Sequence, residues 1–453
     1  MPAQPAVVKC AMTSKACIFA EQAAPRYTSY PTAPHFSRTV GPTTYAGWLA
    51  ELPADTSLSL YLHVPFCAEL CHYCGCHTKV VRRREPIETY AKLLAREIEL
   101  IGEHLGGQPV QGIHWGGGTP STLGPDILVD LTQRIHATLN CTALTEHAIE
   151  FDPRHVDRPL IGALAKMGVT RASLGVQEFA PRVQQAIGRI QPFSRVAECV
   201  TLLREAGIVN LNFDLMYGLP HQSADDLQRT LFLAHTLAPN RIALFGYAHV
   251  PWFKTHQRLI DESALAGAAE RLALAEGARQ SLLSLGYVQI GLDHFAQPDD
   301  SLTRAAANGK LRRNFQGYTT DTADALLGLG ASAIGRLPQG FAQNAPDMGG
   351  YARAIESGQF ATAKGIALSE DDRMRGRIIE QLMCEFTASA NELDDEAFDA
   401  AIDALGPLVV EGFVRIDGRR IKVTPAGRPF VRLVAATFDA YFPHGKARHS
   451  LAV

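Results

Sequence analysis

The sequence lacks long apolar runs, internal repeats, low-complexity tracts and any excess of one charge, and these absences exclude several classes of protein. Within its 453 residues no run approaches the roughly 18 apolar residues of a membrane-spanning helix. The chain has 43 Lys and Arg and 46 Asp and Glu, so its net charge is −3. Such a balance argues against a nucleic-acid partner bound through bulk charge. The N-terminal residues lack a secretory signal pattern. We expect a globular protein with no membrane span.

The chain has nine cysteines, and four of them lie within ten residues, at Cys67, Cys71, Cys74 and Cys76. Cysteines this close together make a poor disulfide framework in a chain of this size. They are more typical of a metal or redox site in a reducing compartment. We therefore expect a cytoplasmic protein.

Six short apolar segments, each followed by helical sequence, predict a parallel sheet. They start about 25–50 residues apart, which is the spacing of βα units. The predicted strands are residues 58–64, 110–115, 146–151, 170–176, 209–215 and 241–247, with helices at 85–104, 125–139 and 223–237 among the intervening segments. The fold class is α/β, and the sheet is either doubly wound or curled into an open, partial (β/α)6 barrel. A long Ala/Leu-rich helix is expected after residue 261, ending near residue 285.

The two ends of the chain have a different character. Residues 1–25 show little pattern and are expected to form a loose leader. From about residue 368 two helices precede the segment 412–423, where Asp417-Gly418 lies between β-branched residues and predicts a hairpin. Helix, helix and hairpin resemble a winged helix. We divide the chain into an N-terminal leader and substrate-covering segment (1–57), a catalytic domain (58–365) and a mainly helical C-terminal domain (366–453).

The cysteine segment follows the first predicted strand, at the sheet edge where α/β proteins keep their sites. Cys67, Cys71 and Cys74 have the spacing C-x3-C-x2-C, which lets three thiolates converge on three corners of an iron–sulfur cube. A [4Fe–4S] cluster normally takes four thiolates, so three would leave one iron open to another ligand. A structural zinc site is the alternative, with Cys76 or a nearby histidine as fourth ligand. Cys76 is interpreted as lying outside the ligand set.

Polar or small residues end each of the later strands. Gly116-Gly117-Gly118 closes the second strand and allows the backbone to approach a ligand closely, although a plain turn is the alternative. Glu150 ends the third strand and is suited to binding ribose hydroxyls, or is a loop charge. Gln177 and Asp214 end the fourth and fifth strands. These side chains are expected at one rim of the sheet.

A C-x3-C-x2-C loop after an apolar strand resembles the radical S-adenosylmethionine (SAM) superfamily. The resemblance implies a [4Fe–4S] cluster whose open iron binds SAM, and a 5′-deoxyadenosyl radical formed when one electron cleaves SAM. More narrowly, the chain resembles the family of oxygen-independent coproporphyrinogen III oxidases over nearly its whole length. The motifs that carry this resemblance are residues 26–32, 74–76, 115–120, 151–153, 174–177, 214–220 and 314–320.

Membership in that family implies a reaction and a set of site residues. Two propionates of coproporphyrinogen III would be oxidatively decarboxylated to vinyl groups without oxygen, giving protoporphyrinogen IX for haem synthesis. Two SAM molecules would be bound. The implied cluster ligands are Cys67, Cys71 and Cys74; the first SAM would contact Tyr61, Gly117, Glu150 and Ile334; the second would contact Tyr73, Gly118, Thr119, Gln177, Arg189, Asp214 and Ala248.

The remaining expectations concern substrate and partners. Coproporphyrinogen carries four carboxylates, which favours arginine forks, and Arg26, Arg312 and Arg313 are the candidates. The reaction needs a low-potential electron donor and a final electron acceptor, neither of which the sequence identifies. The protein is expected to be a monomer. A haem chaperone of a related branch is the alternative function; the segment 26–32 and Cys76 favour the oxidase.

Overall fold

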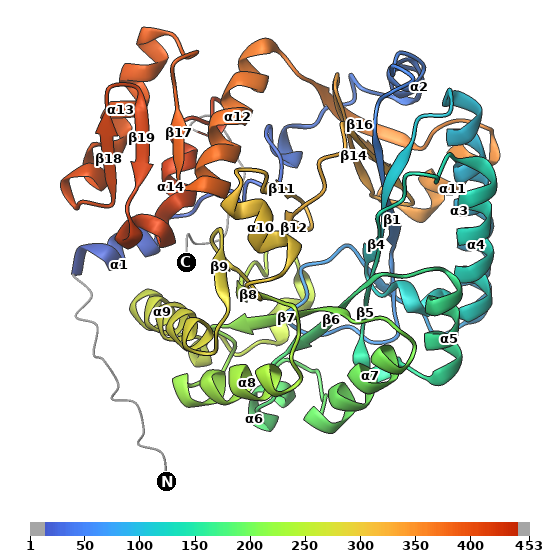
Figure 1. Ribbon diagram of the computed structural model, residues 1–453, viewed down its shortest axis with the longest axis horizontal. Coiled ribbons are helices and arrows are strands. Elements are labelled where there is room, and N and C mark those ends of the chain that lie inside the picture. The colour runs from blue at the N-terminus through green and yellow to red at the C-terminus, as the bar shows by residue number, and fades with distance from the viewer. Residues whose placement is uncertain (1–13, 443–453) are drawn as a thin grey trace.

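A computed structural model describes residues 14–442 and shows one large sheet surrounded by helices, with a smaller domain beside it (Figure 1). The sheet has 12 strands in the order β16-β15-β14-β13-β1-β4-β5-β6-β7-β8-β10-β9. The six strands expected from the sequence are β1 (Leu58–Val64), β4 (Val110–Gly117), β5 (Glu146–Phe151), β6 (Arg171–Gln177), β7 (Asn210–Tyr217) and β8 (Arg241–Gly246). They are parallel and lie side by side in chain order. The strand order does not close on itself, so the barrel is partial.

Strands that the sequence did not reveal extend both edges of this core. On one side β13 pairs parallel with β1, and antiparallel strands follow it; on the other side β10 pairs antiparallel with β8. Their bounds are β9 (Val288–Ile290), β10 (His294–Ala296), β13 (Ala325–Leu329), β14 (Ile334–Leu337), β15 (Gly340–Asn344) and β16 (Thr362–Ala367). The last of these strands in the chain, β16, ends at residue 367, so the domain boundary expected at residue 365 falls within it.

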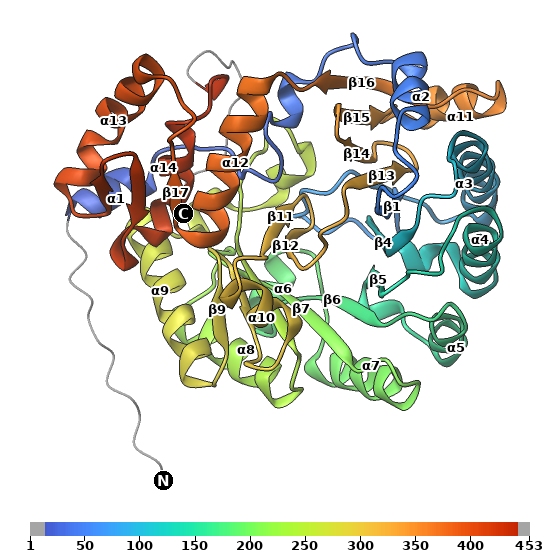
Figure 2. The same ribbon diagram turned by 45° about the horizontal axis from the view of Figure 1, so that its top comes forward.

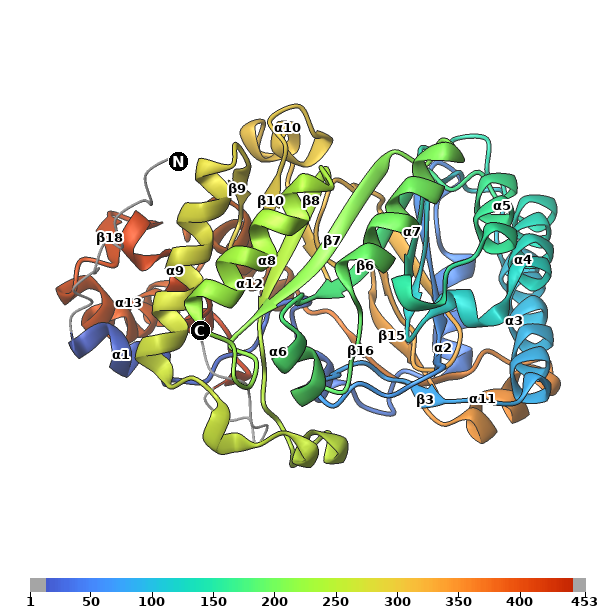
Figure 3. The same ribbon diagram turned by 90° about the horizontal axis from the view of Figure 1, so that it is seen from below.

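Helices cover the outer face of the curved sheet, as the view from below shows (Figure 3). They are α3 (Arg84–His104), α4 (Pro125–Thr138), α5 (Arg158–Lys166), α7 (Phe193–Glu205), α8 (Ala224–Thr236) and α9 (Ala268–Ser284). The long Ala/Leu-rich helix begins at Ala268, six residues later than expected, because a short 3-10 turn occupies residues 262–264. No helix within residues 14–442 has the length and hydropathy needed to cross a membrane.

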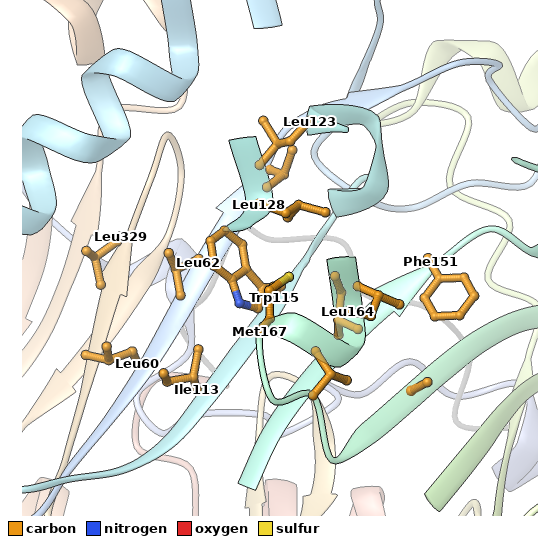
Figure 4. Packing of buried hydrophobic residues seen from close by; sticks show 14 of the residues in the cluster. Leu60, Leu62, Ile113, Trp115, Leu123, Leu128, Phe151, Leu164, Met167 and Leu329 are labelled. Atoms are coloured by element: carbon orange, nitrogen blue, oxygen red, sulfur yellow. The ribbon is translucent and has the colours of Figure 1, made fainter. Parts of the chain in front are cut away.

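The core lies between the strands and the outer helices, as the close view shows (Figure 4). Leu60, Leu62 and Trp115 are fully or almost fully buried there, and burial of each large apolar side chain contributes about 1.5–3 kcal/mol. β1 is buried along its whole length, whereas β6 and β7 alternate between buried and half-buried positions. Their half-buried positions carry polar side chains such as Ser173 and Asp214.

The C-terminal domain packs against the N-terminal end of the chain (Figure 2). Its elements are α12 (Glu370–Glu385), β17 (Thr387–Ser389), α13 (Asp395–Val410), β18 (Val414–Asp417), β19 (Arg420–Val423) and α14 (Val431–Ala436). β18 and β19 form the predicted hairpin. The part of the expected leader that is described is not loose. α1 (Ser14–Ala20) places Phe19 in the core of this domain, where its ring centroid lies 5.7 Å from that of Phe413. The outer ends of the two terminal segments, residues 1–13 and 443–453, lie outside the described residues.

Candidate active site

The cysteine loop begins at the carboxyl end of β1, and two of its three candidate sulfurs accept hydrogen bonds from the loop itself. Cys67 Sγ accepts from the Thr78 hydroxyl at 3.1 Å and lies 3.4 Å from Thr119 Oγ1. Cys74 Sγ accepts from the backbone amide of Cys76 at 3.4 Å. Hydrogen bonds from Cys76 lower the pKa of Cys74 to about 6, while burial raises the pKa of Cys67. The environment of Cys74 therefore favours the thiolate.

The third sulfur, Cys71 Sγ, lies beside two arginines that share one carboxylate. Arg189 Nη1 donates to Cys71 Sγ at 3.4 Å and to Asp152 Oδ2 at 3.1 Å. Arg154 approaches the same sulfur at 3.8 Å and forms a fork with Asp152. Burial opposes ionisation of Asp152, but Arg189 and Arg154 hold its pKa below the usual value. Positive charge is thus fixed next to Cys71, where it stabilises an anionic sulfur.

The segment after β8 holds the cysteine loop from outside, a feature that sequence reasoning missed. Lys254 Nζ donates to the carbonyl of Cys76 at 2.9 Å, and His256 Nε2 lies 2.7 Å from the carbonyl oxygen of Cys74. Gln257 Nε2 donates to the carbonyls of Tyr73 at 2.9 Å and Ala248 at 3.2 Å. The Gln257 amide therefore joins the positions of Tyr73 and Ala248, two predicted contacts of the second SAM. Nothing in the local sequence pattern identifies these three side chains.

The glycine turn after β4 is packed tightly against the cysteine loop. A Cβ atom on Gly118 would lie 2.4 Å from Thr78 Oγ1 and 2.6 Å from the carbonyl oxygen of Phe66. Gly117 has a φ of 111°, which L-residues rarely adopt. The amides of Gly118 and Thr119 donate to the carbonyls of Val64 and Phe66 at 2.8 and 2.7 Å. With those amides engaged, the turn has carbonyl oxygens rather than amides for a ligand, and these suit an ammonium group.

Tyr61 of β1 and Glu150 of β5 lie on either side of β4, and both side chains reach over Gly116. His114 Nε2 lies 2.9 Å from Glu150 Oε1, and the Tyr61 and His114 rings are stacked with centroids 6.0 Å apart. Phe315, in the turn between β11 (Arg312–Asn314) and β12 (Gly317–Thr319), packs edge-on against Tyr61 at 4.4 Å between ring centroids. Ile334, the fourth residue predicted for the first SAM, begins β14, two strands from β1 in the sheet.

Gln177 and Asp214 occupy the ends of β6 and β7. Gln177 has a left-handed φ of 65° next to a bulge, and its amide and the Arg189 guanidinium both lie over Gly175, 2.9 and 3.3 Å from the position of a Cβ there. Burial and the Glu150 carboxylate raise the pKa of Asp214 to about 7. The Gln177 and Arg189 side chains thus meet beside Cys71, and the Asp214 carboxyl is partly protonated near neutral pH.

Of the three predicted substrate arginines, the structure brings two together. Arg313 Nη2 donates to the carbonyl of Arg26 at 3.3 Å. Arg26 is exposed, and its Nη2 donates to the carbonyl of Gly246, the last residue of β8, at 3.3 Å. Arg312 points elsewhere and forms an ion pair with Glu380 at 3.3 Å.

The donors around the three sulfurs fit an iron–sulfur cluster. N–H or O–H groups reach all three sulfurs, as expected where hydrogen bonds tune cluster thiolates. His63 is not a convenient zinc ligand, because its Nδ1 lies 3.0 Å from the Tyr61 hydroxyl and its Nε2 3.0 Å from the His77 carbonyl. Over residues 14–442 no three His, Cys, Asp or Glu side chains are grouped closely enough for a single metal ion, and this applies to Cys67, Cys71 and Cys74 as well. The feature that fits the predicted cluster is the hydrogen-bond donor at each of the three sulfurs.

Comparison with known proteins agrees with this geometry. Residues 61–234 match the radical SAM superfamily, and residues 368–430 match the HemN C-terminal domain. The fold and the cysteine loop therefore define an oxidoreductase of the radical SAM superfamily, which uses a [4Fe–4S] cluster and SAM.

Individual relatives define the family within that class. An oxygen-independent coproporphyrinogen III oxidase of Bradyrhizobium diazoefficiens is 50% identical over 442 residues, which cover 96% of this chain and 98% of the relative. One from Pseudomonas aeruginosa is 38% identical, covering 92% and 94%. The solved structure of coproporphyrinogen III oxidase (HemN) from Escherichia coli, described as a radical SAM enzyme, has a TM-score of 0.87 and 36% identity, covering 92% and 97%. The chain belongs to the family of oxygen-independent coproporphyrinogen III oxidases, as its motifs predicted.

Proposed function

We propose that this chain converts two propionate groups of coproporphyrinogen III into vinyl groups in haem synthesis, giving protoporphyrinogen IX and two molecules of carbon dioxide without oxygen. The observation that carries the proposal is the cysteine loop at the carboxyl end of β1. Its three candidate sulfurs, Cys67, Cys71 and Cys74, each accept a hydrogen bond, in a chain that is 50% identical to an enzyme with this name.

The cluster is held by Cys67, Cys71 and Cys74 alone, and two SAM molecules bind beside it. The first contacts Tyr61, Gly117, Glu150 and Ile334, and the second contacts Tyr73, Gly118, Thr119, Gln177, Arg189, Asp214 and Ala248. When bound, the cluster and SAM would supply the radical chemistry that removes one hydrogen atom from the β-carbon of a propionate. The propionate then loses carbon dioxide and one electron to become a vinyl group. Each turn therefore needs a low-potential one-electron donor and a one-electron acceptor.

The residues of the chain bind SAM and the cluster and orient them. The carbonyl oxygens of the glycine turn accept from the SAM ammonium group, and the Glu150 carboxylate, which pairs with His114, accepts from ribose hydroxyls. Phe315 packs on Tyr61 and limits the access of water to this part of the site. Arg189 fixes positive charge against Cys71, which favours the anionic, reduced state of the cluster.

The remaining expectations are part of the same proposal. Residues 58–365 form the catalytic domain, residues 1–57 cover the substrate and residues 366–453 form the C-terminal domain. The protein works as a monomer in the cytoplasm. The close spacing of the four cysteines at 67–76, which suits a metal or redox site rather than disulfides, supports a reducing compartment.

The test is an anaerobic assay of the reconstituted chain with dithionite, SAM and coproporphyrinogen III, followed by chromatography of the oxidised porphyrins. We expect protoporphyrin, with at least two SAM molecules cleaved for each product. Cys71→Ser should abolish the product, whereas Cys141→Ser, a free cysteine outside the loop, should retain it. No product from the wild-type chain, together with tight haem binding, would favour the haem chaperone instead.

A further inference from the structure

Positive charge gathers beside the cysteine loop, in a chain whose net charge is −3. Residues 70–84 contain one lysine and three arginines but no Asp or Glu, and residues 248–260, after β8, contain one lysine and one arginine and again no Asp or Glu. The two segments lie on the same side of the molecule (Figure 3) and are joined by the hydrogen bond from Lys254 to the Cys76 carbonyl. We call residues 79–83, Phe253 and Lys254 the basic surface.

One part of the basic surface is a short strand that lies directly against a proposed cluster ligand. β3 (Lys79–Val80) pairs in parallel with β2 (Phe66–Cys67), and Val80 lies opposite Cys67 in this register. The amide of Val81 donates to the Cys67 carbonyl at 3.1 Å. Both residues of β3 are exposed, Val80 to 40%. The strand therefore connects the exterior of the protein with the backbone of Cys67.

The residue before β3 extends this connection to the sulfur atom. The hydroxyl of Thr78 donates to Cys67 Sγ at 3.1 Å, and the amide of Lys79 donates to the Pro65 carbonyl at 2.9 Å. One peptide bond and one hydrogen bond thus separate exposed Lys79 from the candidate ligand sulfur. An electron delivered at β3 would have a short, hydrogen-bonded path to Cys67.

Three cations of the basic surface are available to a partner. Lys79, Arg82 and Arg83 are exposed, and none of them forms an ion pair among residues 14–442. Exposed, unpaired cations attract and orient an anionic partner before contact, because their field extends over about a Debye length of 8–10 Å.

The carboxylates of the same stretch leave this charge in place. Residues 65–88 contain three of them. Glu69 pairs with Arg154 at 2.7 Å and Glu88 with Arg84 at 3.6 Å, and Glu85 lies in the first turn of α3. Three unpaired cations in this stretch therefore outnumber its one unpaired carboxylate.

The segment after β8 adds apolar area to the basic surface. The side chain of Phe253 is 73% exposed, and the Lys254 ammonium group lies 5.1 Å from the centroid of its ring. Leu259, farther along the same segment, is 65% exposed. Exposed apolar side chains mark interaction sites when they occur together, and aromatic residues and arginine are enriched in protein–protein interfaces. This combination fits a protein partner better than a small anion.

We infer that the basic surface is the docking site for an acidic carrier protein that delivers single electrons to the cluster. The inference rests on the proposed function for its need of an electron, and it adds the chemistry of the donor and its place on the chain. In each delivery the reduced carrier loses one electron and the cluster gains it by way of Cys67. Carboxylates around the redox centre of the carrier would pair with Lys79, Arg82 and Arg83.

The first test measures binding, apart from any activity. Titration calorimetry at low ionic strength would give the affinity of the reconstituted chain for two acidic carriers, a flavodoxin and a plant-type [2Fe–2S] ferredoxin. The double variant Arg82→Glu, Arg83→Glu should bind the preferred carrier at least about 10-fold more weakly, and the difference should shrink as salt is added. The charge-conserving Arg82→Lys, Arg83→Lys should bind it within about twofold of the wild type.

A matched control reverses two charges elsewhere. Arg229 on α8 and Arg415 on β18 are both exposed, so Arg229→Glu, Arg415→Glu changes the net charge equally and should alter the affinity by less than about twofold. An equal loss in both glutamate variants would mean that only net charge matters, and would overturn the inference. So would a wild-type chain that binds neither carrier, or one that binds a DNA duplex more tightly than either of them.

The second test follows electron delivery through methionine released from SAM, with no coproporphyrinogen present. With the reduced carrier below saturation, Arg82→Glu, Arg83→Glu should lower the rate about 10-fold. With reduced methyl viologen, a small cation that needs no docking, the rate should stay within about twofold of the wild type. An equal loss with both reductants would show damage to the cysteine loop and would overturn the inference. Failure to form protoporphyrinogen in the separate product assay would refute the proposed function alone.

Discussion

Gly118→Ala tests how tightly the glycine turn must pack against the cysteine loop. The added Cβ would lie 2.4 Å from Thr78 Oγ1 and 2.6 Å from the backbone carbonyl oxygen of Phe66. Thr78 could rotate away, but it would then lose its hydrogen bond to Cys67 Sγ. The Phe66 carbonyl can only move with the loop, because it is backbone and accepts from the Thr119 amide at 2.7 Å.

The magnitude follows from these contacts. Overpacking a well-packed site costs about 1–3 kcal/mol, and one lost hydrogen bond adds about 1 kcal/mol. We therefore expect Gly118→Ala to lower the free energy of unfolding by about 2–4 kcal/mol and to reduce the iron retained after reconstitution. The measurements are urea unfolding of the metal-free chain and iron and sulfide content per chain.

A matched control lies in the cysteine loop itself. A Cβ on Gly75 would meet no atom within 4 Å, so Gly75→Ala should change the free energy of unfolding by less than about 0.5 kcal/mol. If Gly118→Ala behaved like Gly75→Ala in stability and in iron content, the contact between the glycine turn and the cysteine loop would be wrong.

Three further predictions concern charge and packing. Asp152→Ala leaves Arg154 and Arg189 without their shared carboxylate and should lower the free energy of unfolding by about 3–5 kcal/mol. The control Glu205→Ala breaks an exposed pair with Arg158, whose side chains are 55% and 77% exposed, and should cost less than about 1 kcal/mol. Equal losses in urea unfolding would contradict the prediction for Asp152. Asp214 has a folded-state pKa of about 7, above that of an unfolded carboxyl, so its contribution to stability is lost as the pH rises towards and through 7. The metal-free Asp214→Asn variant should therefore gain stability relative to the wild type across that pH range. A difference in stability that does not change with pH would refute the raised pKa. Phe19→Ala should lower the free energy of unfolding by about 3 kcal/mol, because Phe19 packs in the core of the C-terminal domain. Ile18 is 60% exposed, so Ile18→Ala should leave the free energy of unfolding nearly unchanged. Similar melting temperatures for the two variants would argue against the packing of Phe19.

The six parallel strands could be predicted from the sequence because each is a short, strongly apolar segment between helices. Their observed ends differ from the predicted ends by at most two residues, as at β4 and β7. The hairpin at Asp417-Gly418 was predicted for a similar reason, since the turn chemistry is local. Features that depend on residues close in sequence are therefore recovered well.

Features that depend on tertiary contacts were not recovered. The strands β13–β16 were not predicted, because β13 is a strand by virtue of pairing with the edge of β1, and β14, β15 and β16 each pair in turn with the strand before. Residues 14–20 were expected to be loose, and their helix owes its stability to Phe19 packing on a domain nearly 400 residues later. Arg432 could not be connected with the N-terminal segment, because only packing of the C-terminal domain brings it to the carbonyls of Ala24 and Pro25.

The candidate site shows the same division. Cys67, Cys71 and Cys74 were predicted as ligands from their spacing, and each has a hydrogen-bond donor in the structure. The side chains that hold the loop from outside, such as Gln257, were missed because they come from an irregular segment about 180 residues later.

Electron paramagnetic resonance of the reduced, reconstituted chain, recorded with and without SAM, tests the three-cysteine site most directly. The wild type and a Cys76→Ala variant should both give a signal close to one spin per chain, and SAM should shift both signals, because the fourth iron is open to it. A signal that SAM leaves unchanged, or a Cys76→Ala variant that no longer assembles the cluster, would show that four cysteines close the site and would contradict the account.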